Sequence, residues 1–177
     1  MSQDSLDDLL KEVRACRECE AHLPLGPRPV LRASGSARIL IIGQAPGTKV
    51  HQSGIPWNDP SGERLRDWMQ TGPERFYDEK EIAIIPMGFC YPGKGKSGDL
   101  PPRTECATHW HERLLAGLPR LQLRLLVGKY AQDYYLGTKR QSLAHTVLHW
   151  RDYLPDYFPL PHPSPRNMRW FRLNPWF

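Results

Sequence analysis

The chain has 177 residues, 24% of them charged, and a formal net charge of +5 at pH 7. This length suits one domain spanning residues 1–177, and the lack of an apolar run of about 18 residues excludes a conventional membrane-spanning helix. The N-terminus is acidic and has no apolar signal-peptide core, so we expect a cytoplasmic protein. The basic excess falls after residue 20, which makes a polyanion a candidate partner, beside the simpler interpretation of a basic soluble protein.

The first predicted element is a helix that leads into a pair of cysteines. Apolar residues recur at helical spacing from Leu6 to Val13, and Ser5 is a candidate N-cap. Cys16 and Cys19 follow in a CxxC arrangement.

The first predicted strand is Arg38–Ile42, an apolar run rich in β-branched residues that suits the centre of a covered parallel sheet. It ends in a glycine-rich turn, Gly43–Gly47, with the sequence GQAPG. Turns at the carboxyl ends of strands are where open α/β sheets bind ligands, and glycines permit a close approach of the backbone. An ordinary strand-to-loop turn is the alternative interpretation.

Strands and helices alternate along the rest of the chain, which predicts a mostly parallel sheet of four strands covered on both faces, a three-layer αβα fold. The remaining predicted elements are a loop over 43–60, a helix capped by Asp59 or Ser61 and running through Met69, a strand over 82–85, a loop over 87–102, a helix over 103–118, a strand over 123–127, a short helix around 134–136, a helix over 142–150 and a strand over 157–160. The loops at 44–59, 87–102 and 162–167 should emerge at the same edge of the sheet.

The four cysteines are candidate metal ligands. The CxxC pair is matched by Cys90 and Cys106, which are separated by 15 residues, and four thiolates suit a [4Fe–4S] cluster or a structural zinc ion. Buried thiols without a ligand are the alternative. Gly93–Ser97 reads GKGKS, but Cys90 stands where a phosphate-binding P-loop needs a glycine, so this segment is interpreted as a mobile basic loop or a plain solvated one.

Three aromatic or basic features are candidates for nucleic-acid chemistry. His162 follows the last strand between two prolines, in a frame that can hold an imidazole at the sheet edge, although a single histidine is more often structural. Trp57 could stack a base or anchor its loop in the core. The segment Met168–Trp170, just past His162, is basic with an apolar tip and could enter a DNA groove, or pack into the core instead.

The combination of motifs resembles the uracil-DNA glycosylase superfamily. The resemblance rests on GQAPG, the later Gly54-x-Pro56-Trp57, the four cysteines and His162-Pro163-Ser164, whose order and spacing agree from about Cys16 to Asn167. The motifs are most similar to the iron–sulfur family 4 enzymes, with GEAPG, an aromatic residue after G-x-P, HPS and the same cysteine spacing. The HPSPRN…NPWF ending resembles a less characterised bacterial branch.

The resemblance implies a monomeric DNA repair enzyme that hydrolyses the N-glycosidic bond of a flipped, deaminated base, with uracil as the expected base, in double- or single-stranded DNA. It implies a [4Fe–4S] cluster on the four cysteines, with structural zinc or no cofactor as alternatives. By position, Gln44 and Ala45 line the water and sugar side, Trp57 stacks the base and His162 lies near its carbonyl. We further expect substrate contacts from Gly43, Ala45, Pro46, Gly47, Pro86, Ser164 and Asn167, and DNA contacts from Arg166, Met168 and Arg169.

Two departures from the family pattern matter. The first motif has no carboxylate, because Ala45 replaces the aspartate of the classical enzymes and Gln44 the glutamate of family 4. Asp59 and His51 are the nearest candidates to activate water; otherwise Gln44 and the backbone only position it. Pro86 stands where family 4 has an asparagine that reads the pyrimidine edge, which leaves open another base such as hypoxanthine, or a nucleic-acid-binding module with weak or no catalysis. A separate alternative is an enzyme acting on a nucleotide or another small ligand.

Overall fold

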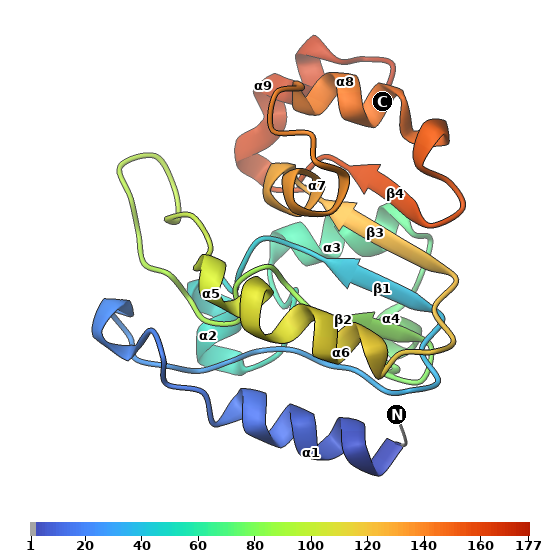
Figure 1. The fold of residues 1–177 in the computed structure, drawn as a ribbon. Coiled ribbons are helices and arrows are strands. Elements are labelled where there is room, and N and C mark those ends of the chain that lie inside the picture. Colours follow the sequence, from blue (N-terminus) through green and yellow to red (C-terminus); the bar gives the residue numbers. More distant parts are fainter. Residues whose placement is uncertain (1–2) are drawn as a thin grey trace.

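The structure is a computed structural model and describes residues 3–177. It has three layers, with a four-stranded sheet between two layers of helices, which confirms the predicted fold class (Figure 1). The strands lie in the order β2-β1-β3-β4, and all three neighbouring pairs are parallel. Their bounds are β1 Ile39–Ile42, β2 Ile82–Ile84, β3 Leu123–Val127 and β4 Tyr157–Leu160.

The helices agree with the predicted alternation but are more numerous and shorter. They are α1 Gln3–Arg14, α2 Thr48–Ser53, α3 Pro60–Trp68, α4 Pro73–Phe76, α5 Thr104–Cys106, α6 Glu112–Ala116, α7 Lys129–Leu136, α8 Leu143–Leu148 and α9 Met168–Leu173. One turn of π-helix, Ala107–His111, joins α5 to α6, so the helix predicted over 103–118 contains a wide turn. Across residues 3–177 the longest helices are too short or too polar to span a membrane.

Two predicted details need correction, and one of the two predicted caps of α3 is confirmed. The first helix begins at Gln3, so Ser5 lies inside it and is not its N-cap. The loop over 43–60 contains α2, which is capped by Gly54 in the left-handed conformation that glycine adopts without strain. Asp59 was one of two predicted caps of α3, and its Oδ1 accepts a hydrogen bond from the Gly62 amide at 2.8 Å.

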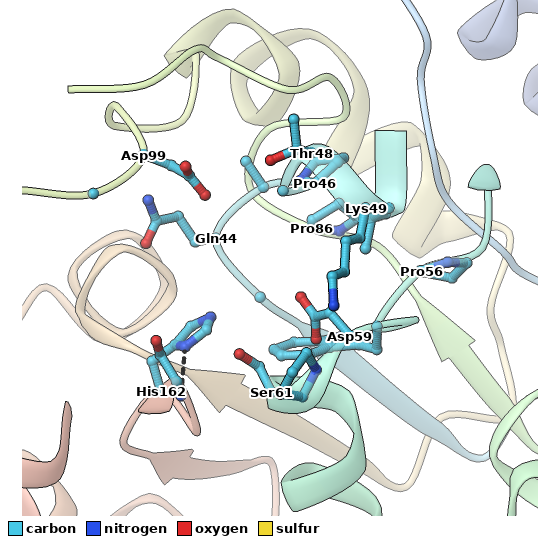
Figure 2. Close-up of a pocket in the computed structure, with 18 of the residues that line it drawn as sticks. Gln44, Pro46, Thr48, Lys49, Pro56, Asp59, Ser61, Pro86, Asp99 and His162 are labelled. Atoms are coloured by element: carbon cyan, nitrogen blue, oxygen red, sulfur yellow. Dashed lines mark hydrogen bonds between the residues drawn. The ribbon is translucent and has the colours of Figure 1, made fainter. Parts of the chain in front are cut away.

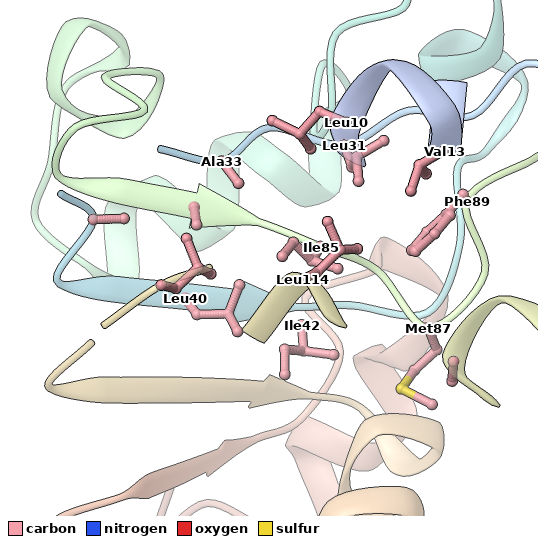
Figure 3. Close-up of a cluster of buried hydrophobic side chains, with 14 of the residues drawn as sticks. Leu10, Val13, Leu31, Ala33, Leu40, Ile42, Ile85, Met87, Phe89 and Leu114 are labelled. Carbon is pink, nitrogen blue, oxygen red and sulfur yellow. The ribbon is translucent and has the colours of Figure 1, made fainter. Parts of the chain in front are cut away.

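The core lies on both faces of the sheet because successive strand residues point to opposite sides. On one face, Leu40 and Ile42 of β1 pack with the apolar stripe of α1 and with Leu114 of α6 (Figure 3). On the other face, Ile41 packs with Leu65 of α3 and with side chains of α4. The two apolar layers hold β1 rigidly at the centre of the sheet.

The connections bring several loops to the carboxyl edge of the sheet. Strand β1 lies between β2 and β3, so the strand order reverses beside β1. In open α/β sheets, such a reversal leaves a crevice at the carboxyl ends of the strands. The segment after β2 is tied to the first turn, because the Met87 amide donates to the Gly43 carbonyl at 2.9 Å and the Gly88 amide to Gln44 at 2.9 Å.

Candidate active site

A cavity of about 540 Å³ opens at this edge (Figure 2). It is formed by the turn after β1, the approach to α3, the segment after β2, residues 97–99 and the loop after β4. The predicted meeting of the three strand-end loops is therefore present. The predicted site residues that line the cavity are Gly43, Gln44, Ala45, Pro46, Gly47, Trp57, Asp59, Pro86, His162, Ser164, Arg166 and Asn167.

His162 is held as a neutral hydrogen-bond donor. The Ser164 amide donates to its Nδ1 at 3.2 Å, so the proton of the neutral ring sits on Nε2. The Asn167 side chain donates to the His162 carbonyl at 2.7 Å and fixes the loop. Burial lowers the pKa of His162 to about 4, with the charge of Asp59 acting in the opposite direction. At neutral pH the ring can therefore donate through Nε2 but carries no charge.

Trp57 forms a flat wall beside this imidazole. The two ring centroids are 5.5 Å apart and the planes are inclined by 32°. The backbone of Trp57 has φ +58°, a left-handed conformation that is uncommon for an aromatic residue. A Cβ on Gly43 would lie 2.7 Å from Trp57 Cζ2, so the ring needs a glycine at this position of the turn. The GQAPG motif thus makes room for the aromatic wall.

Gln44 and Asp59 both line the cavity and are both engaged in hydrogen bonds. The Gln44 side-chain amide donates to the Leu100 carbonyl at 3.3 Å. One oxygen of Asp59 caps α3 through Gly62, as described above. Figure 2 shows the two side chains on opposite sides of the cavity.

The structure does not place His51 with these residues. It is buried on α2, its ring centroid lies 6.3 Å from that of Tyr91, and it is absent from the cavity wall. Met168 and Arg169 begin α9 and also lie outside the wall. Of the two candidates for water activation, only Asp59 therefore lies at the cavity.

The sequence model of the uracil DNA glycosylase superfamily matches residues 32–177, which is most of the chain. The chain belongs to the uracil-DNA glycosylase superfamily. It is similar to the type-4 uracil-DNA glycosylase of Archaeoglobus fulgidus, with 23% identity over 131 residues. That match covers 74% of this chain and 63% of the relative, so the chain spans less than two thirds of the relative's length.

Two charged side chains at this cavity were missed by the sequence interpretation. Lys49 on α2 and Asp99 between β2 and α5 both line it. Asp99 follows a stretch of glycines and lysines whose pattern gave no sign of a turn back towards β1. The hydrogen bonds that bring it there are described below.

His111 supports one wall of the cavity from behind. It is 2% exposed, its Nε2 lies 3.0 Å from the Pro86 carbonyl, and its Nδ1 lies 2.6 Å from the Tyr135 hydroxyl. A carbonyl accepts only, so Nε2 carries the proton and Nδ1 accepts from Tyr135. Burial lowers the pKa of His111 to about 4. The Pro86 carbonyl is thus occupied by His111.

The two neutral histidines predict a loss of stability in mild acid. In the unfolded chain both rings bind a proton near pH 6.5, but in the folded protein only near pH 4, so between these values the unfolded state binds more protons. The free energy of unfolding should fall by about 2 kcal/mol per ring between pH 7 and pH 5. Urea denaturation at the two pH values measures the difference. Between pH 7 and pH 5 a His111→Gln variant should lose less free energy of unfolding than wild type. Equal stability of wild type at both pH values would contradict the assignment of both histidines as neutral.

The four cysteines meet at a second, smaller cavity of about 20 Å³. All four line it and none is in a disulfide. Burial raises the pKa of Cys90 to about 11 and that of Cys106 to about 12, so in the protein alone these two are neutral thiols. Within residues 3–177 no three metal-binding side chains are already arranged around a single ion. The donor set suits an iron–sulfur cluster or zinc, but the ligand geometry is not preformed.

Proposed function

We propose that this protein is a DNA glycosylase that hydrolyses the N-glycosidic bond of a flipped base, with uracil as the expected base. The observation that carries the proposal is the pairing of the Trp57 ring with a neutral, Nε2-protonated His162 in a cavity at the carboxyl edge of the sheet. A family 4 affiliation is supported by the cysteine spacing and by the name of the similar protein from Archaeoglobus fulgidus.

The proposed reaction follows from where charge develops. A base turned out of the duplex stacks against Trp57, and its bond to C1′ of the sugar breaks with the electron pair leaving on the base. The Nε2–H group of His162 stabilises the negative charge on the base carbonyl, and it does so as a neutral donor whose position is fixed by Ser164. Water enters on the side of Gln44 and attacks C1′.

The rim of the cavity carries positive charge suited to DNA. Lys49 and Arg166 line it, and Arg169 follows on α9. Such side chains bind phosphate groups without reading sequence. We therefore propose that they hold the backbone next to the flipped nucleotide.

The wall at Pro86 offers little to read a base by hydrogen bonding. Proline has no amide hydrogen, its carbonyl is engaged by His111, and the amides of Met87 and Gly88 are bonded to the turn after β1. We propose that selectivity comes from shape and from the His162 donor, so uracil and hypoxanthine should both be tested as substrates.

The four cysteines are proposed to hold a [4Fe–4S] cluster. Bound there, the cluster would supply a structural crosslink between the CxxC segment, the loop at Cys90 and α5. On binding the cluster, the cysteines would lose their protons and act as thiolate ligands, whereas Cys90 and Cys106 are neutral thiols in the protein without a cluster.

Protein purified without oxygen should be brown and contain about four iron atoms per chain. Cys106→Ser should remove most of the visible absorption and lower the melting temperature, because one corner of the crosslink is lost. Thr108→Ser, an exposed change two residues away, should leave both unchanged. A colourless protein with one zinc atom per chain would show that the four cysteines bind zinc and not a cluster. Protein that contains neither metal would contradict the proposal.

The function is tested with oligonucleotides that contain uracil or hypoxanthine, incubated with the protein and then treated with alkali, which cleaves abasic sites. Strand cleavage that depends on the modified base supports the proposal. Salt-dependent DNA binding without base release would favour a binding module. Competition by free nucleotides but not by DNA would favour an enzyme acting on nucleotides.

A further inference from the structure

We propose that Asp99 is the general base that takes the proton from the attacking water. This inference rests on the proposed glycosylase function and assigns a catalytic role to a residue outside the motifs of the first turn and of the loop after β4. It supplies the carboxylate that the GQAPG turn lacks.

Two carboxylates line the cavity among the described residues, and they are placed differently. Asp59 accepts a hydrogen bond from the Gly62 amide. Its charge also acts on His162, where it partly opposes the lowering of the pKa by burial, so Asp59 belongs to the side where the base leaves. The Asp99 side chain is exposed at the cavity and forms no hydrogen bond or ion pair with another of residues 3–177. It is the carboxylate that remains available to a water molecule.

A hairpin fixes the position of Asp99. The Leu100 amide donates to the Gly93 carbonyl at 2.8 Å, and the Gly95 amide to the Gly98 carbonyl at 2.6 Å. The Leu100 side chain packs against Gly93 and Gly95, where added Cβ atoms would lie 3.3 Å from it. Residues 93–100 therefore form a hydrogen-bonded turn that fixes where Asp99 lies.

The hairpin is attached to both motifs of the site. Gln44 donates to the Leu100 carbonyl, next to Asp99. Arg166 packs against Gly98, where an added Cβ would lie 3.0 Å from Arg166 Nη1. On the other side, a Cβ on Gly47 would lie 3.6 Å from Asp99 Oδ2. Figure 2 shows Asp99 next to Gln44, on the side of the cavity away from Ser61 and Asp59. The carboxylate thus faces the side on which Gln44 is expected to position water.

The step balances without a further reactant. The water oxygen forms a bond to C1′ as the bond between C1′ and the base nitrogen breaks, and the electron pair leaves with the base. The water proton passes to the Asp99 carboxylate and is then released to the departing base or to solvent. The negative carboxylate also stabilises the positive charge that develops on the sugar.

The test measures base release in a single turnover, after the wild-type protein has been assayed on uracil- and hypoxanthine-containing DNA. Asp99→Asn should lower the rate about 10²–10³-fold while DNA affinity stays within about twofold, because a positioned general base acts on the chemical step alone. Asp99→Glu should keep part of the rate. The matched control Asp152→Asn, an exposed aspartate in the turn after α8, should match wild type.

Chemical rescue separates a catalytic role from a structural one. Added formate should restore part of the activity of Asp99→Ala but leave wild type unchanged, since a small carboxylate can occupy the vacated space. Wild-type activity together with an unimpaired Asp99→Asn protein, or failure of formate to rescue Asp99→Ala, would overturn this inference alone. A wild-type protein that releases neither base would overturn the proposed function and the inference with it.

Discussion

Replacement of His162 by alanine is expected to lower the single-turnover rate of base release by about 10²–10³-fold, the usual effect of removing a preorganised donor to a developing anion. The Nε2–H donor is lost, whereas Trp57 and the basic rim remain, so DNA affinity should change little. A denaturant midpoint should be measured beside the rate, because the substitution also removes a half-buried ring.

A second variant and the pH dependence of the rate sharpen this prediction. His162→Gln retains a side-chain amide donor and should keep more of the rate than His162→Ala. Because the pKa of His162 is lowered to about 4, the wild-type rate should not fall through this group until the pH approaches that value. A rate that follows a histidine titration near pH 6.5, or an unimpaired His162→Ala protein, would contradict the neutral-donor role.

Gly62→Ala is expected to damage both stability and activity, although Gly62 does not line the cavity. An added Cβ would lie 1.7 Å from the Trp57 carbonyl oxygen, a backbone atom, so the loop itself must move. That carbonyl also accepts from Arg66 Nη1 at 3.3 Å, and this bond would be disturbed. We expect a loss of about 1–3 kcal/mol in the free energy of unfolding.

The same change should reduce base release at least about tenfold, since displacement of Trp57 removes the wall opposite the base and contacts of this kind contribute about 1–3 kcal/mol per base. Gly72→Ala is the matched control, because nothing lies within 4 Å of its added Cβ and its φ is −77°. Equal melting temperatures and rates for the two variants would show that the Trp57 loop tolerates displacement.

The sheet was predictable because each strand is a short apolar run between breakers. Leu40, Ile41 and Ile42 are buried on both faces, and such runs leave a clear sequence pattern. Helix α2 was missed because its six residues are mostly polar and are set between glycines, which is also the pattern of a loop. Short elements of this kind depend on their tertiary neighbours more than on their own sequence.

The candidate site was predictable only in part. Gln44, Trp57 and His162 were placed together because each follows a strand or lies in a strand-end loop of the same edge. The position of His51 could not be predicted, since one turn of α2 decides whether a side chain faces the cavity or the interior. Asp99 depends on the pairing of residues 93–100, which glycine-rich segments do not encode locally.

The wide turn Ala107–His111 has a mechanical consequence. In a turn of i→i+5 type, residues five apart lie over one another, and Cys106 and His111 have this separation. Phe89 joins them from the side, since its amide donates to Cys106 Sγ at 3.5 Å and its ring stacks on His111 with centroids 5.7 Å apart. Packed side chains therefore join the cysteine cavity to the wall at Pro86, so we expect oxidation of Cys106 to change the shape of the larger cavity as well.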